Sequence, residues 1–133
     1  MNLRSFRLMF FVGALWNFLV AIVAIIFASW VTRFFYGQPV EGVVGMLAWK
    51  DFAACVFLFG VGYLLVAINP WKNHGIVFLG ILGKLAVTWT FLSRYWHGIA
   101  TIGVIFPVAV DFTFALLFAW FLLRRRRVLG PAW

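Results

Sequence analysis

Long apolar runs separated by short polar breaks make up most of this chain. Crossing about 30 Å of hydrocarbon takes about 20 helical residues, and four runs reach or approach that length. They are residues 8–31, 43–68, 76–96 and 101–123. The breaks between them carry turn-forming Gly, Pro and Asn residues. The pattern predicts an all-α polytopic membrane protein with a single transmembrane domain, an antiparallel bundle of four helices arranged as two hairpins in series.

Composition agrees with a membrane protein. Hydrophobic residues make up 66% of the chain and charged residues only 11%, with a mean hydropathy of +1.08, whereas about a quarter of the residues in soluble domains are charged. The formal net charge of +8 would suit nucleic acid, but no polar stretch is long enough to form a water-exposed basic domain. The single cysteine, Cys55, excludes chemistry that needs an intrachain dithiol.

Basic residues at the ends of the predicted helices indicate the orientation, because Lys and Arg are enriched on the cytoplasmic side. One membrane face would carry Arg4, Arg7, Lys72, Arg124, Arg125, Arg126 and Arg127. The other would carry only Arg33 and Arg94. We therefore expect both termini in the cytoplasm. The basic tail, residues 124–133, is expected to anchor on anionic lipid through its four arginines, each worth about 1 kcal/mol.

Charged residues inside the predicted spans are the first candidates for a functional site, because isolated charges in a bilayer are costly. Lys84 would lie about 12 Å and Asp111 about 18 Å from the same membrane surface, at about 1.5 Å per residue. A lysine side chain can bridge that difference, and consecutive antiparallel helices contact each other. We expect a Lys84–Asp111 ion pair, either as a structural contact between helices or as a site for a ligand or a proton.

Other polar residues are expected at the same depth. The amide of Asn17, on a stripe of small residues, should bond to another helix, and Thr88 follows Lys84 by one helical turn. Pro107 has no N–H, so we expect it to kink the last helix and to free the carbonyl of Gly103. Together with the ion pair, these groups would form a polar pocket inside the membrane.

Lys50 and Asp51 interrupt the second apolar run. Either the helix begins at Val43 and buries both charges, or residues 41–49 lie along the outer interface and the charges lie near water. We favour the second arrangement because a charge that faces lipid is costly. Since Asp51 shares a helical face with the small residue Ala54, we expect Asp51 to face the bundle and Lys50 to extend outward.

Sequence patterns for catalysis or metal binding are missing. His74 and His97 fall in turns at opposite ends of the third predicted helix, which argues against a bis-histidine haem. No pair of His, Cys or carboxylate residues has the spacing of metal ligands, and there is no Ser-His-Asp or phosphate-loop pattern. We therefore expect neither an enzyme nor a resident cofactor, and a bound quinone or lipid stays as an alternative.

Several short motifs resemble those of the DoxX-like proteins, small four-helix proteins of the bacterial inner membrane. The motifs are Gly62-Tyr63, the turn Asn69-Pro70 with Asn73-His74-Gly75, the segment from Gly80 to Lys84, and the segment from Asp111 to Phe118. The resemblance covers roughly residues 60–123. It implies a bacterial inner-membrane location and an accessory role near respiratory or electron-transfer chemistry, and it implies no catalytic residue.

Three functions are compatible with these patterns. The leading hypothesis is a non-enzymatic accessory or scaffold subunit of a larger membrane complex, because the chain is small and 21% aromatic, which suits an outer surface covered by lipids and other membrane subunits. The second is a binder of a hydrophobic molecule such as a quinone or a lipid in the polar pocket. The third is proton transfer through Asp51, Lys84 and Asp111. We expect no nucleic-acid partner.

Overall fold

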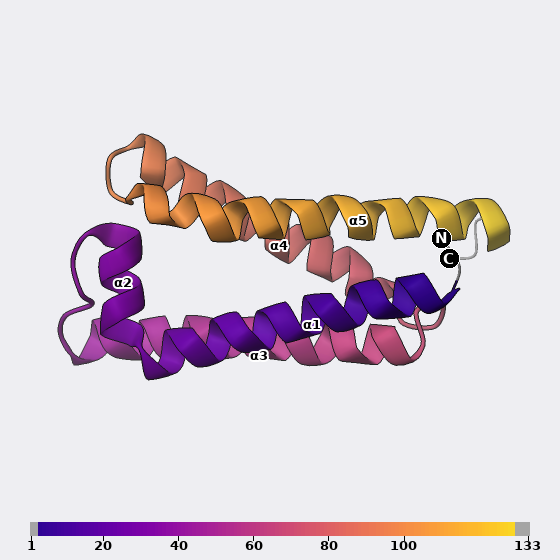
Figure 1. Cartoon of the computed structure of the whole chain (residues 1–133), viewed down its shortest axis with the longest axis horizontal. Helices are drawn as coiled ribbons and strands as arrows, with labels where there is room; N and C mark the ends of the chain where they lie inside the picture. Colours follow the sequence, from indigo (N-terminus) through magenta and orange to yellow (C-terminus); the bar gives the residue numbers. More distant parts are fainter. Residues whose placement is uncertain (1–2, 130–133) are drawn as a thin grey trace.

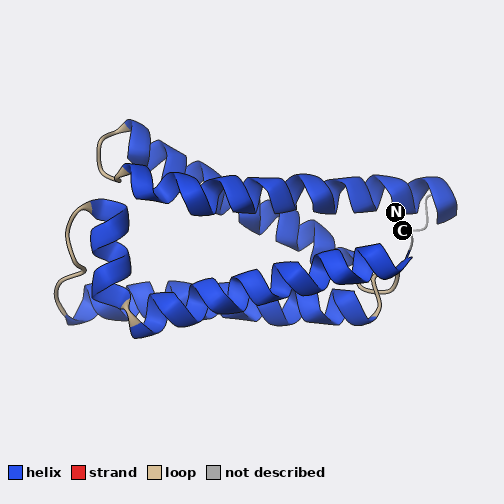
Figure 2. Cartoon of the chain, viewed as in Figure 1, coloured by secondary structure: helices blue, strands red, loops and turns tan. Residues whose placement is uncertain are grey.

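The computed structural model describes residues 3–129, which are helical apart from short connections and include no strand. Figure 1 labels the helices α1 (Leu3–Ile26), α2 (Ala28–Tyr36), α3 (Val43–Ile68), α4 (His74–Trp96) and α5 (Ile105–Leu129), and Figure 2 shows the short connections between them. A 3-10 turn, η1 (Ile102–Val104), comes directly before α5. Four helices are long and apolar enough to cross a membrane. The predicted fold class, a membrane-type bundle of four long helices, is confirmed.

The four long helices form two pairs. Helix α1 packs along α3 and α4 packs along α5, as expected for two hairpins in series. The pairs converge at the end of the molecule where α1 begins, α3 turns into α4 and α5 ends (Figure 1). The core there is aromatic, with Phe10, Tyr63, Phe118 and Phe121 at most 1% exposed. We call this the basic end, because Arg4, Arg7, Lys72 and Arg124 also lie there.

Glycines allow the helices to approach each other closely. A Cβ atom at Gly60 would lie 2.7 Å from the ring of Phe18 on α1, and one at Gly80 would lie 2.6 Å from the ring of Tyr63 on α3. Small residues are the usual means of close helix contact in lipid, where water does not drive apolar surfaces together. These glycines therefore fix how α1 and α4 lie against α3.

The first predicted span differs from the structure at both ends. Helix α1 begins at Leu3, and the chain bends at Phe27, so that residues 28–36 form the separate helix α2. Distant contacts hold α2: Thr101 donates through its hydroxyl to the Phe34 carbonyl at 2.5 Å and through its N–H to the Phe35 carbonyl at 2.7 Å. Residues 8–31 contain no Pro and are apolar throughout, so the sequence gives no local sign of the bend. Tertiary contacts stabilise it.

The last predicted span also differs. Pro107 lies in the first turn of α5, where its missing N–H costs no hydrogen bond of the helix, so the predicted kink is replaced by a helix start. A Cβ at Gly103 would lie 2.6 Å from the Phe34 carbonyl oxygen, so Gly103 serves close packing on α2. At the other end α5 continues to Leu129, because arginine is a good helix former.

Candidate intramembrane binding site

The predicted ion pair joins α4 to α5. The Lys84 ammonium lies 2.5 Å from Oδ1 of Asp111, with the two side chains 5% and 17% exposed. It also donates to Oδ1 of Asn17 on α1 at 3.3 Å, and the Asn17 amide donates to the Val56 carbonyl on α3 at 3.2 Å. The prediction that Lys84, Asp111 and Asn17 meet is confirmed, and the four long helices all contribute to the cluster.

Aromatic rings complete the surroundings of the ammonium. The Lys84 nitrogen lies 5.6 Å from the ring centroid of Tyr63 and 5.4 Å from that of Phe114, within the range of cation–π attraction. The Tyr63 hydroxyl donates to the Gly80 carbonyl at 3.4 Å, one turn before Lys84. The lysine is thus held by a carboxylate, an amide and two ring faces, and the charges of the pair cancel.

The cluster keeps hydrogen-bonding capacity. An ammonium has three donors, and the bonds to Asp111 and Asn17 use two of them. Among the described residues, neither the third donor nor the second oxygen of Asp111 has a protein partner. The cluster can therefore offer one donor and one acceptor to another molecule.

A cavity of about 500 Å³ lies against this cluster, between the two helix pairs. Its polar wall includes Asn17, Lys84 and Asp111, and its apolar walls include the rings of Trp16, Phe59 and Phe106. The volume lies within the range of about 300–1,000 Å³ that small-molecule sites occupy. The ion pair therefore lines an open space as well as joining two helices.

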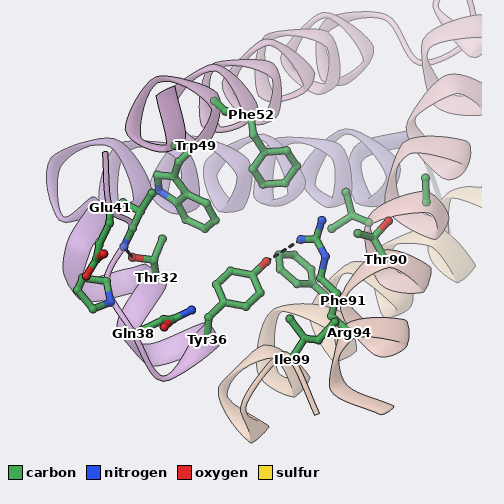
Figure 3. A pocket seen from close by; sticks show the side chains of 16 residues that line it. Thr32, Tyr36, Gln38, Glu41, Trp49, Phe52, Thr90, Phe91, Arg94 and Ile99 are labelled. Carbon is green, nitrogen blue, oxygen red and sulfur yellow. Dashed lines mark hydrogen bonds between the residues drawn. The ribbon is translucent and has the colours of Figure 1, made fainter. Parts of the chain in front are cut away.

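A second cavity, the α2 cleft, lies at the end of the molecule opposite the basic end. It measures about 800 Å³ between α2, the loop that follows α2, α3 and α4 (Figure 3). Across it Arg94 donates to the Tyr36 hydroxyl at 2.8 Å, and the two side chains point toward each other in Figure 3. The two cavities are adjacent, since they share the lining residues Trp49, Phe52, Ala86, Val87 and Phe91.

Sequence reasoning missed the α2 cleft. The indole of Trp49 forms part of its wall and donates to the Ala24 carbonyl at 2.9 Å, although a tryptophan near a helix end commonly marks membrane depth. The cleft depends on the bend at Phe27, which brings Tyr36 on α2 toward Arg94 on α4. No local pattern near these residues signals that bend.

Thr88 and Gly103 do not join the polar cluster, whereas Pro107 lines the cavity. Thr88 is buried outside the cavity lining, and its hydroxyl has no hydrogen-bond partner within residues 3–129. Arg124 is exposed at the basic end, while the side chains of 125–127 lie outside the described part of the structure. Lipid anchoring by the four arginines therefore stays a prediction.

Lys50 and Asp51 lie apart from the cavity, on the exposed surface of α3. The expected inward orientation of Asp51 is wrong, because Ala54 on the same face is also exposed. Helix α3 does begin at Val43, as in the first of the two arrangements considered, yet it leaves both charges uncovered. The buried face of α3 is formed instead by residues such as Ala53 and Tyr63.

Metal binding and family membership receive no support. Among the described residues, no group of three or more His, Cys, Asp or Glu side chains could hold a metal ion. His74 is the first residue of α4 and His97 follows its last. Comparison of the chain with protein-family models, curated proteins and solved structures finds no match, so the resemblance to DoxX-like proteins stays a prediction.

Proposed function

We propose that this protein binds a hydrophobic small molecule, a quinone or a lipid, in the cavity at the Lys84–Asp111 pair. The observation that supports this function best is the position of the pair. A hydrogen-bonded ion pair with side chains only 5% and 17% exposed lines a cavity of about 500 Å³. Ionisable residues inside a membrane protein commonly mark substrate sites.

The chemistry of the walls favours a particular kind of head group. The remaining donor of Lys84 suits a carbonyl oxygen, and the second oxygen of Asp111 suits a hydroxyl. Because the two formal charges cancel, a neutral head group needs no further counter-charge. A flat ring would stack on Trp16, Phe59 or Phe106, and an isoprenoid or acyl tail would lie along the aliphatic walls.

The other two hypotheses have less support. Every membrane-length helix exposes large apolar side chains, which lipid alone can cover, so the accessory-subunit role stays a prediction. A proton path through Asp51, Lys84 and Asp111 lacks continuity, because Asp51 lies outside the cavity that the other two residues line.

Binding of decylubiquinone tests the proposal. The protein in lipid nanodiscs should retain the quinone in native mass spectrometry, and the quinone should quench the fluorescence of Trp16 and Trp49, which line the cavity. A dioleoyl phospholipid and a fatty alcohol, offered in the same way, distinguish a lipid ligand from a quinone. If the protein retains none of the three molecules, the proposal is contradicted.

A double variant separates binding from folding. Replacing a buried ion pair by apolar residues of similar volume is commonly tolerated, whereas removing one partner is not. Lys84→Met/Asp111→Leu should therefore fold, as judged by helical circular dichroism, and should bind at least tenfold more weakly. Leu79→Ala, on the exposed face of α4, is the matched control and should bind normally. Equal binding by the double variant would refute a role for the pair.

A further inference from the structure

One face of α3 is exposed along the whole helix. Its residues recur at alternating intervals of three and four: Val44, Leu47, Asp51, Ala54, Leu58, Val61, Leu65 and Ile68. This is the spacing of the a and d positions of a heptad repeat, the contact seam of paired helices. We call these residues the α3 seam. All of them are exposed, with Val44 at 80% and Leu58 at 67%.

Among residues 3–129, no other helix covers the seam. Helix α1 packs on the opposite side of α3, where Asn17 bonds to the Val56 carbonyl, Trp49 bonds to α1 and Gly60 contacts Phe18. At about 100° per residue these α3 positions lie roughly half a turn from Asp51. A neighbouring helix can therefore reach the seam without displacing α1.

The charges distinguish this face from the apolar faces of the other helices. Lys84 and Asp111 pair internally, and the remaining described charges of α1, α4 and α5 lie close to helix ends. Lys50 and Asp51, by contrast, lie about 11 Å into α3, at about 1.5 Å per residue. Both are exposed, and within residues 3–129 neither makes an ion pair or hydrogen bond. Opposite charges that face lipid without partners are costly.

A second copy of the chain would satisfy both charges at once. Two copies inserted in the same direction are related by a two-fold axis normal to the membrane, so identical residues lie at identical depth. In a parallel helix pair, an a-position side chain packs into a hole whose walls include the partner's a residue and the residue before it. Each Asp51 would then lie against the partner's Lys50 as well as the partner's Asp51, and the two Lys50 ammonium groups would offset the two carboxylates in this layer.

We propose that the α3 seam is a homodimer interface, closed by two reciprocal Lys50–Asp51 ion pairs. Ala54 forms the next layer, where a small side chain lets the backbones approach. Leu58 and Leu65 fill the layers toward the basic end. The patch is self-complementary in charge, as a two-fold interface requires. No residue of the α3 seam lines the cavity at Lys84. The dimer proposal therefore does not depend on the proposed ligand.

Disulfide cross-linking tests where the copies meet. The chain has one cysteine, Cys55, so Cys55→Ala gives a cysteine-free background for single probes. Ala54→Cys, in the seam, should form a disulfide-linked dimer when the protein is oxidised in liposomes at low protein-to-lipid ratio. Leu79→Cys, exposed on α4, is the matched control and should not. Equal cross-linking at the two positions, or none at either, would overturn the proposal.

Charge variants in the Ala54→Cys background test how the copies recognise each other. Lys50→Asp places two acidic residues at positions 50 and 51, and Asp51→Lys places two basic ones there. Each variant alone should cross-link roughly tenfold less than the parent, because a tenfold change corresponds to the loss of about one polar contact between membrane helices. Mixing the two, or combining both changes in one chain, should restore the dimer. Because the residues are exposed, helical circular dichroism should stay unchanged. If none of these changes alters the yield of cross-linked dimer, Lys50 and Asp51 do not pair between copies, and the proposal is refuted.

Discussion

The membrane-length helices carry two sets of one lysine and one aspartate, and within the chain one set forms an ion pair whereas the other does not. Lys84 and Asp111 come from consecutive helices that pack together, and they meet at 2.5 Å with their side chains 5% and 17% exposed. Lys50 and Asp51 are neighbours in sequence, yet both are exposed and do not pair. Adjacent helical residues point about 100° apart, so proximity in the chain does not produce contact. Pairing in a bundle follows depth and helix packing.

The largest effect on stability should come from removing one partner of the buried Lys84–Asp111 pair. Asp111→Leu leaves the Lys84 ammonium buried without its carboxylate, which should cost about 3–5 kcal/mol. Asp51→Leu, on the exposed face, is the matched control and should change the stability of the monomer by less than about 0.5 kcal/mol. Unfolding by SDS titration in mixed micelles measures both, and similar losses for the two variants would contradict the contrast between the pairs.

The position of Lys84 depends on how closely α4 approaches α3. Gly80→Ala places a methyl group where the Tyr63 ring lies, 2.6 Å from its nearest atom, and should destabilise the protein by about 1–3 kcal/mol. Gly75→Ala is the control on the same helix, because a Cβ there has no neighbour within 4 Å. The same SDS titration compares the two. A harmless Gly80→Ala change would show that close packing does not position the lysine.

Asn17 should contribute least to the buried pair. Asn17→Ala removes one acceptor from Lys84 and one donor from the Val56 carbonyl, while Lys84 keeps its bond to Asp111. Polar contacts between membrane helices are modest, so the loss should be about 1 kcal/mol. Thr113→Ala is the control, since Thr113 is exposed and, within the described part of the chain, its hydroxyl bonds only to the Ala109 carbonyl of its own helix. A loss as large as that of Asp111→Leu would contradict this ranking, because the amide would then matter as much to the site as the charge pair.

Sequence reasoning succeeded where length and depth decide the outcome. The four membrane-length helices and the meeting of Lys84, Asp111 and Asn17 follow from apolar run length and from the rise per residue. It failed where distant contacts decide. The bend at Phe27 is stabilised by Thr101, which lies 67 residues from its partner Phe34. The side of α3 that faces α1 depends on the fit of Gly60 against Phe18, which no periodicity in a uniformly apolar helix reveals.

The most direct test of the central claim is an experimental density map at the depth of Lys84, from protein incubated with decylubiquinone. The map should show Lys84 and Asp111 in contact, with a flat ring density in the cavity beside them and close to Trp16. The claim would be contradicted if Lys84 and Asp111 point away from each other. It would also be contradicted if side chains fill the cavity and leave no room for a ligand.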